Sequence, residues 1–177
     1  VSLLLPADSA WREGGQVGET VERPTLESVS DQQIEAAASA ISAAKNPIII
    51  MNGTALSETG LAAAARLKAA GIRVMTDTFY AKMRRCAGVF APERMQYFAE
   101  GAMEDLEGSD LMVLVGTSTP VAFFSYPGKP SVLVPEGCEV FDLGAATTNS
   151  AMTLEALAAH MNATDAAPAA TLQLPDA

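Results

Sequence analysis

The feature that most constrains the fold is an uninterrupted apolar run, Leu111 to Val115, that ends in Gly116 and three hydroxyl residues. Such a run is typical of a strand that is covered on both faces in a parallel sheet. In open parallel sheets, ligands bind beyond the carboxyl ends of the strands, where the chain turns tightly. The sequence therefore places Gly116, Thr117, Ser118 and Thr119 at a candidate binding edge.

The same four residues also have a purely structural interpretation. Gly116 can simply allow the turn, and the hydroxyl side chains can cap a short helix that begins at Pro120, because hydroxyl caps are common where a strand leads into a helix. Both interpretations stay open at the level of the sequence.

Composition limits the classes of partner. A chain of 177 residues can bury a core of its own without a metal or a disulfide. Its 11 basic and 21 acidic residues give a net charge of -10, which repels nucleic-acid phosphates and anionic lipid, so we expect no nucleic-acid and no membrane partner. The two cysteines, Cys86 and Cys138, make no disulfide framework, which indicates reduced thiols in a cytoplasmic protein.

The remaining elements follow from apolar periodicity and from end signals. Ser30 to Gln33 has the spacing of a capping box that begins a helix. We expect strands at 48–51, 72–75 and 139–143, and further helices at 57–70, 92–106 and 153–161. Gly53 follows the first strand as Gly116 follows the central one. Segment 131–134 is also strand-like, but the four residues between it and 139–143 are too few for a parallel crossover, so at most one of them joins the parallel sheet, and we favour 139–143.

Four basic residues fall within thirteen positions of this acidic chain: Lys82, Arg84, Arg85 and Arg94. They could receive a phosphate, although short charge runs are also typical of a solvated surface. Cys86 lies beside two of these arginines, and nearby positive charge activates a thiol. An alternative hypothesis is therefore a self-contained nucleotide-binding module, or a small enzyme that uses Cys86.

No motif predicts catalytic or metal-binding residues. The sequence has no G-x-G-x-x-G at a strand-helix junction, no Walker sequence and no Ser/His/Asp set. His160, the only histidine, falls in the last turn of the predicted final helix, where no second histidine can share a metal. On chemistry alone, the sequence favours a scaffold or a binding module.

The order of several short motifs resembles the central domain of thiamine diphosphate-dependent enzymes of the acetolactate synthase type. These motifs are Lys45-Asn46-Pro47 before the first strand, Gly53 after it, Gly71 to Val74, Phe90 to Arg94, and Asp110 to Gly116. Leu3 to Asp8 resembles the last strand of that family's pyrimidine-binding domain. The stretch from Pro120 to Pro130 is similar to a subgroup of acetolactate synthase-like proteins.

This resemblance implies a doubly wound, Rossmann-like, mostly parallel α/β sheet of about six strands with helices on both faces. It implies a parent enzyme, a transferase or a lyase, that acts on 2-keto acids with thiamine diphosphate and magnesium. The family holds the activating glutamate in the preceding domain and the magnesium-diphosphate motif in the following one, so we expect this chain to be noncatalytic by itself.

The resemblance also sets the expected domain boundaries. Residues 1–29 would be the end of the preceding domain and a linker, 30–161 the central domain, and 162–177 a linker towards a missing C-terminal domain. The expected partners are the flanking domains of the same polypeptide, in a parent homodimer or homotetramer. The aromatic-rich stretches 95–98 and 123–126 are the candidates for packing on these neighbours, so we expect weak self-association of the chain.

In this family the central domain carries FAD or ADP in some members and no cofactor in others. Parallel strands would bring the candidate cofactor-binding residues to one rim, with the arginines reaching it from the long loop: Gly53, Thr76, Gly116, Thr117, Thr119, Asp142, Arg84 and Arg85. Ala55 stands where a second glycine is common, and Asp142-Leu143-Gly144 where two aspartates are frequent. Because a Cβ at Ala55 would hinder the approach of a diphosphate, we expect no cofactor in the isolated domain, with ADP or FAD as the favoured occupant otherwise.

Overall fold

The computed structural model describes residues 4–22, 24–124 and 127–165, and these contain one five-stranded parallel sheet in the order β3-β2-β1-β4-β5. The strands are β1 (Pro47–Met51), β2 (Arg73–Thr76), β3 (Glu93–Arg94), β4 (Leu111–Val115) and β5 (Glu139–Asp142). The helices are α1 (Ala7–Trp11), α2 (Asp31–Ala43), the short 3-10 helix η1 (Gly53–Leu56), α3 (Glu58–Ala69), α4 (Ala99–Leu106) and α5 (Ser150–His160). The predicted α/β class is confirmed, with five described strands where the resemblance implies about six.

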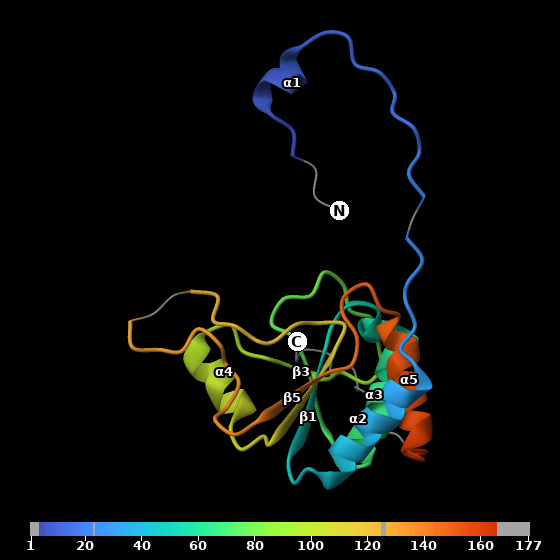
Figure 1. Ribbon diagram of the computed structural model, residues 1–177, viewed down its shortest axis with the longest axis vertical. Coiled ribbons are helices and arrows are strands. Elements are labelled where there is room, and N and C mark those ends of the chain that lie inside the picture. Colours follow the sequence, from blue (N-terminus) through green and yellow to red (C-terminus); the bar gives the residue numbers. More distant parts are fainter. Residues whose placement is uncertain (1–3, 23, 125–126, 166–177) are drawn as a thin grey trace, which may run out of the picture.

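Helices cover both faces of the sheet. Figure 1 shows α2, α3 and α5 on one side of the strands and α4 on the other. Ile49 and Val113 pack in the core under α2, α3 and α5, whereas Ile48 and Met112 pack in the core under α4. Successive residues of one strand point to opposite faces, so a strand with a core on each side needs apolar residues at every position. This is why the run Leu111 to Val115 is uninterrupted.

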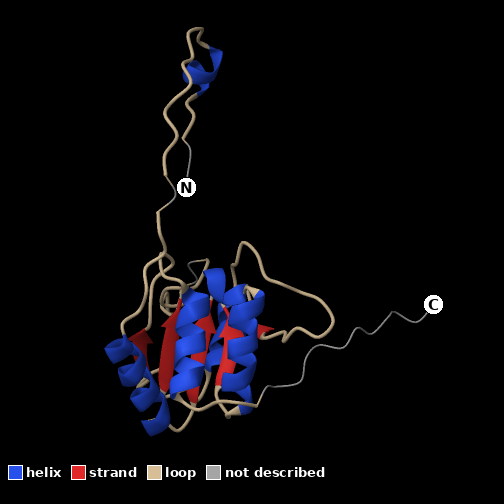
Figure 2. Ribbon diagram, turned by 90° about the vertical axis from the view of Figure 1, so that its right-hand side faces the viewer, coloured by secondary structure: helices blue, strands red, loops and turns tan. Residues whose placement is uncertain are grey.

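The segment before α2 extends away from the sheet, as Figures 1 and 2 show. Its helix α1 has no buried residue. Among the described residues, the first backbone hydrogen bonds between this segment and the sheet domain are made by Glu27, whose N–H donates to Thr147 O at 3.1 Å and whose carbonyl accepts from Asn149 N at 2.9 Å. The predicted capping box then begins α2, because Ser30 Oγ accepts from Gln33 N at 3.3 Å and Gln33 Oε1 accepts from Ser30 N at 3.2 Å.

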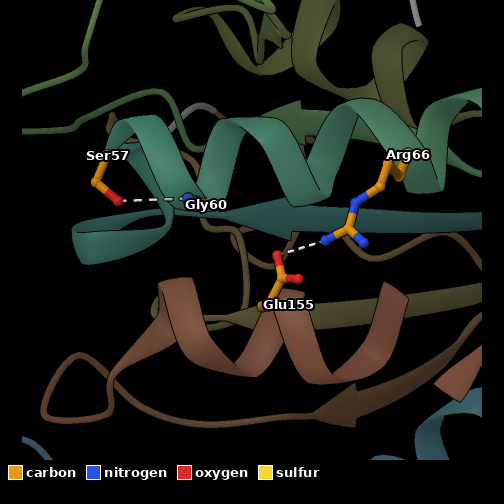
Figure 3. Close-up of polar contacts among 4 residues, drawn as sticks. All are labelled: Ser57, Gly60, Arg66 and Glu155. Atoms are coloured by element: carbon orange, nitrogen blue, oxygen red, sulfur yellow. Dashed lines mark hydrogen bonds and ion pairs between the residues drawn. The ribbon is translucent and has the colours of Figure 1, made fainter. Parts of the chain in front are cut away.

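Helix α3 is held at its start and along its length by polar contacts, which Figure 3 shows in close-up. Ser57 caps it by accepting a hydrogen bond from Gly60 N at 3.4 Å. The guanidinium of Arg66 forms an ion pair with Glu155 and so ties α3 to α5. Gly71, just after the end of α3, has a φ of 92°, which is the left-handed conformation that the sequence predicts there.

The prediction of a helix from residue 92 is wrong in its first half. Glu93 and Arg94 form β3, which pairs in parallel with β2, and Met95 N donates to Thr76 O at 3.1 Å. Helix α4 starts only at Ala99, and Phe98, which precedes it, has 60% of its surface exposed. Pairing along the open edge of β2 satisfies backbone groups that an isolated first helical turn would leave unbonded.

The two strand-like segments after β4 behave as the crossover argument predicts. Residues 139–142 join the parallel sheet next to β4 as β5. Val132 instead makes an antiparallel bridge with Val121, so segment 131–134 folds back on the chain that leaves β4. Within the described residues no helix begins at Pro120, and the predicted short helix at that position is wrong.

Asp110 joins the link between α2 and β1 to the start of β4. Its carboxylate accepts from Lys45 N at 2.7 Å and from Asn46 N at 2.8 Å. These two backbone hydrogen bonds lower the pKa of the Asp110 carboxyl below its ordinary value of 3.8, and the bond from Lys45 has the larger effect. The contact ties the turn Lys45-Asn46-Pro47 to the start of β4.

Replacing Asp110 by Asn is expected to lower the free energy of unfolding near neutral pH, because the amide keeps one acceptor oxygen for two N–H donors. Folding lowers the Asp110 pKa, so the stabilisation is complete above 3.8 and is lost as the pH falls through the lower folded value. Urea unfolding of the chain and of the variant at neutral pH and below 3.8 measures this difference. Glu35→Gln, at an exposed carboxylate on α2, is the control. A penalty that is equal at both pH values contradicts the assignment.

Candidate functional site

The carboxyl ends of the strands form one rim, as the sequence predicts. Met51, the last residue of β1, is in register with Thr76 on one side and with Val115 on the other. Gly53 and Gly116 follow these ends with φ angles of 62° and 69°. They are neighbours in space, because a Cβ added to Gly53 would lie 3.8 Å from the carbonyl oxygen of Gly116.

Gly116 is a packing residue and offers no space to a ligand. It is buried, and its N–H donates to Gly144 O at 2.7 Å. A Cβ added there would lie 2.3 Å from Ser150 Oγ and 2.7 Å from Asn52 O. The missing side chain lets the end of β4 lie directly against the start of α5.

The hydroxyl side chains at this rim differ in their hydrogen bonds and in their exposure. Thr117 Oγ1 donates to the carboxylate of Asp77, which connects the segments that follow β4 and β2. Thr76 is fully buried, and its hydroxyl has no hydrogen-bond partner among the described residues. Thr119 is half-buried and Ser118 is exposed. The capping interpretation of these hydroxyls is wrong, since no described helix begins beside them.

Asp142 lies on the outer strand of the sheet, where β5 pairs only with β4. Its carboxylate is exposed and accepts from Gly144 N at 3.0 Å, so it stabilises its own turn. Asp142 does not line the cleft that contains Gly53 and Arg84.

A cleft of about 670 Å³ opens beside η1 and the start of α3. Its lining residues come from the turn after β1 and from the long loop after β2, with one residue from the turn before α5: Asn52, Gly53, Thr54, Leu56, Ser57, Glu58, Ala81, Lys82, Arg84 and Ala146. Of the predicted cofactor-binding residues, this cleft brings together Gly53 and Arg84. Ala55 is fully buried in the core, so its Cβ does not narrow the cleft.

Of the four basic residues that the sequence groups together, two share the cleft and two lie elsewhere. Arg84 lies in the cleft, and its Nε is 3.8 Å from the Glu58 carboxylate. Lys82 also lines the cleft, without an ion pair to the described residues. Arg85 instead donates to the Tyr80 hydroxyl at 3.0 Å. Arg94 lines a smaller cleft of about 340 Å³.

Five aromatic side chains form one cluster that the sequence analysis does not predict. This aromatic cluster consists of Phe79, Tyr97, Phe98, Phe123 and Phe124, whose neighbouring rings have centroids 4.8 to 5.7 Å apart. The phenylalanines are 44% to 60% exposed. The rings come from the segments after β2, β3 and β4, and an aromatic residue after each of three strands is the signal available in the sequence. Ser125 and Tyr126, which the sequence groups with them, lie outside the described residues.

The two cysteines and the potential metal ligands among the described residues form no site. Cys86 is exposed and Cys138 is half-buried, and both are free. Burial, with the charge of Asp110 as a second cause, raises the pKa of the Cys138 thiol above its ordinary value. In the described parts of the chain, no three His, Cys, Asp or Glu side chains gather as metal ligands. No described helix has the length and apolar character needed to cross a membrane.

No protein-family model matches this sequence. The chain is 38% identical over 175 residues to the Mycobacterium tuberculosis protein named "Putative acetolactate synthase large subunit IlvX", in an alignment that covers 98% of this chain and 33% of the relative. The chain thus spans about a third of the length of this curated relative.

Two solved structures are similar in fold. The thiamine diphosphate-dependent 4-hydroxybenzoylformate decarboxylase of Rhodococcus jostii RHA1 has a TM-score of 0.56 at 21% identity, over 97% of this chain and 34% of the decarboxylase. The benzoylformate decarboxylase of Polynucleobacter necessarius has a TM-score of 0.51 at 19% identity, over 92% of this chain and 32% of that enzyme. The chain is therefore a relative of thiamine diphosphate-dependent, acetolactate synthase-like enzymes and corresponds to about one third of such a protein.

Proposed function

We propose that this chain is the noncatalytic central domain of a thiamine diphosphate-dependent, acetolactate synthase-like enzyme that acts on 2-keto acids. The observation that carries the proposal is the alignment of nearly the whole chain to only a third of its relative. The described residues supply a parallel sheet and two cores, but no cluster of metal ligands. Thiamine diphosphate and magnesium would then be held by flanking domains, beyond linkers at 1–29 and 162–177, in a cytoplasmic homodimer or homotetramer.

A direct assay of the purified chain tests this assignment. With thiamine diphosphate and magnesium present, the chain is expected not to consume pyruvate, because it would lack the domains that activate the cofactor. An acetolactate synthase of known activity, assayed in the same buffer, is the positive control. Sustained pyruvate consumption by the chain alone contradicts the proposal.

The proposed central domain has no resident nucleotide. The Glu58 carboxylate lies 3.8 Å from Arg84 inside the cleft, so it repels a diphosphate and already pairs with the guanidinium that would bind it. Asp142 and Arg85 are engaged with Gly144 and Tyr80. The eight rim residues named as candidates thus do not converge on one cleft, which supports an empty site.

Denaturing freshly purified chain tests for a nucleotide. The released supernatant is expected to contain neither flavin nor adenine nucleotide by absorbance and mass spectrometry. Stoichiometric recovery of either compound contradicts the empty-site proposal, and its loss in an Asp142→Ala variant would show that it binds beside β5.

The rival function, a small enzyme that uses Cys86, has a separate test. Arg84 is beside Glu58 and Arg85 bonds to Tyr80, so both guanidiniums have other partners than the thiol. Alkylation of Cys86 near neutral pH is therefore expected to be no faster than that of a cysteine in an unfolded peptide. Rapid, selective labelling of Cys86 supports the rival and weakens the central-domain proposal.

The aromatic cluster is the proposed contact with the flanking domains. Exposed aromatic side chains in one patch are typical of an interaction surface, so the isolated chain is expected to self-associate weakly and to bind an apolar-surface dye. Sedimentation of Phe98→Ser should show less association than the unchanged chain. Trp11→Ser, which changes an 88% exposed ring in the segment before α2, is the matched control. A strict monomer at high concentration without dye binding contradicts this role.

A further inference from the structure

A further depression lies on the α4 face of the sheet, away from the cleft beside η1. This groove, of about 560 Å³, runs between α4 and segment 129–136. Its lining residues are Glu100, Met103, Glu104, Glu107, Gly108, Lys129, Pro130, Val132, Leu133, Val134, Pro135 and Glu136. Met103 is 38% exposed and Val132 is 52% exposed, so apolar side chains from both walls face the solvent.

The charges around this groove are almost all negative. Glu100, Glu104 and Glu107 follow one another at spacings of four and three residues along α4, and Glu136 belongs to the other wall. Lys129 is the one cation among the lining residues, and its Nζ is 3.6 Å from the Glu100 carboxylate. The other three carboxylates have no ion pair with the described residues.

This acidic row is unfavourable for the helix that carries it. Like charges three and four residues apart repel one another on a helix, and a negative charge near the carboxyl end opposes the helix dipole. Helix α4 has no basic residue in its last turn to offset this. Its buried contacts come from Ala99, Ala102 and Leu106, so folding of the core does not require the carboxylates. A cationic partner would relieve the repulsion.

We propose that this groove binds a cationic, amphipathic peptide segment of a partner protein. Apolar side chains of the segment would cover Met103 and Val132, and its lysines or arginines would pair with the row from Glu104 to Glu107 and with Glu136. Glu104 and Glu107 lie about one helical turn apart and Glu136 belongs to the other wall, so the unpaired carboxylates match several basic residues of a peptide segment better than one small cation. The chain's own net charge of -10 disfavours a second copy as the occupant.

Peptide titration of the full chain tests the groove. The probe is a capped synthetic peptide with leucines on one helical face and lysines beside them, followed by amide chemical shifts of the labelled chain. We expect saturable shifts at residues 103–108 and 132–136, and weaker binding at higher salt. Because an exposed ion pair is worth at most about 1 kcal/mol, the double variant Glu104→Gln/Glu107→Gln should bind roughly 2- to 30-fold more weakly. Glu35→Gln on α2, on the opposite face of the sheet, should bind as the unchanged chain does.

Two matched peptides separate the components of binding. A peptide with glutamates in place of the lysines should not bind, and one with serines in place of the leucines should bind more weakly than the probe. The proposal is overturned by an absence of saturable shifts, by shifts centred on the aromatic cluster, or by equal binding of the serine peptide. Equally tight binding of a small polyamine also overturns it, because the groove would then recognise charge alone.

Discussion

Replacing Gly116 by Ala is expected to lower the free energy of unfolding by roughly 2–5 kcal/mol. Gly116 has a φ of 69°, a left-handed conformation that costs an L-residue roughly 1–2 kcal/mol. The added Cβ would also lie 2.7 Å from the backbone oxygen of Asn52 and 2.3 Å from Ser150 Oγ. Ser150 can rotate, but the Asn52 carbonyl cannot move without shifting the end of β1, and such overpacking costs about 1–3 kcal/mol.

Gly108 provides the matched control for this substitution. Its φ is 73°, close to that of Gly116, but a Cβ added there has no atom within 4 Å. Gly108→Ala should therefore lose only the backbone contribution of roughly 1–2 kcal/mol. Urea unfolding followed by circular dichroism measures both variants. If both variants lost the same free energy of unfolding, the overlap of the added Cβ with Asn52 and Ser150 would have no cost, which contradicts this prediction.

Replacing Gly60 by Ala should destabilise the chain by about 1–3 kcal/mol, although alanine is normally the better helix former by about 1 kcal/mol. A Cβ on Gly60, in the first turn of α3, would lie 2.2 Å from the carbonyl oxygen of Ala55 and 2.6 Å from its carbonyl carbon. Both atoms belong to the backbone of η1, so the overlap can be relieved only by separating η1 from α3. The cost of that movement exceeds the gain in helix propensity.

Gly101 in α4 is the counterpart of Gly60, and Gly101→Ala is expected to change stability in the opposite direction. The atoms near its added Cβ are those of the Gln96 side-chain amide, the nearest at 2.5 Å. This amide can move, at the loss of a 3.4 Å bond to Gly101 O and a 3.3 Å bond to Asp105. We expect a change between zero and a gain of about 1 kcal/mol in thermal or urea unfolding. A loss as large as that of Gly60→Ala contradicts this distinction between backbone and side-chain overlap.

The parts of the fold that obey local rules could be predicted from the sequence. The run from Leu111 to Val115 indicates a strand between two cores, and the Ser30 capping box marks the start of α2. Strand β3 could not be predicted, because its two residues carry no period of their own and pair only since β2 presents an open edge. Pro92-Glu93 suits the first turn of a helix, but pairing with β2 overrides this local preference.

Only those parts of the candidate site whose positions follow from the course of the backbone could be predicted from the sequence. The order of parallel strands brings Gly53 and Gly116 together, since both follow strand ends that are in register. Side chains on long loops are different, because their direction depends on contacts that the sequence does not display. Arg84 thus enters the cleft while Arg85 bonds to Tyr80. The aromatic cluster could not be predicted for the same reason. Phe79 and Phe123 are far apart in the sequence, but their ring centroids are 5.1 Å apart in the structure.

Calorimetry tests whether this chain is a noncatalytic domain of a thiamine diphosphate-dependent enzyme. Thiamine diphosphate is titrated into the purified chain in the presence of magnesium, with an intact enzyme of the acetolactate synthase type as the positive control. We expect heats equal to those of dilution for the chain, because the groups proposed to hold the diphosphate and to activate the thiazolium would lie in other domains. Saturable binding in the micromolar range would contradict it.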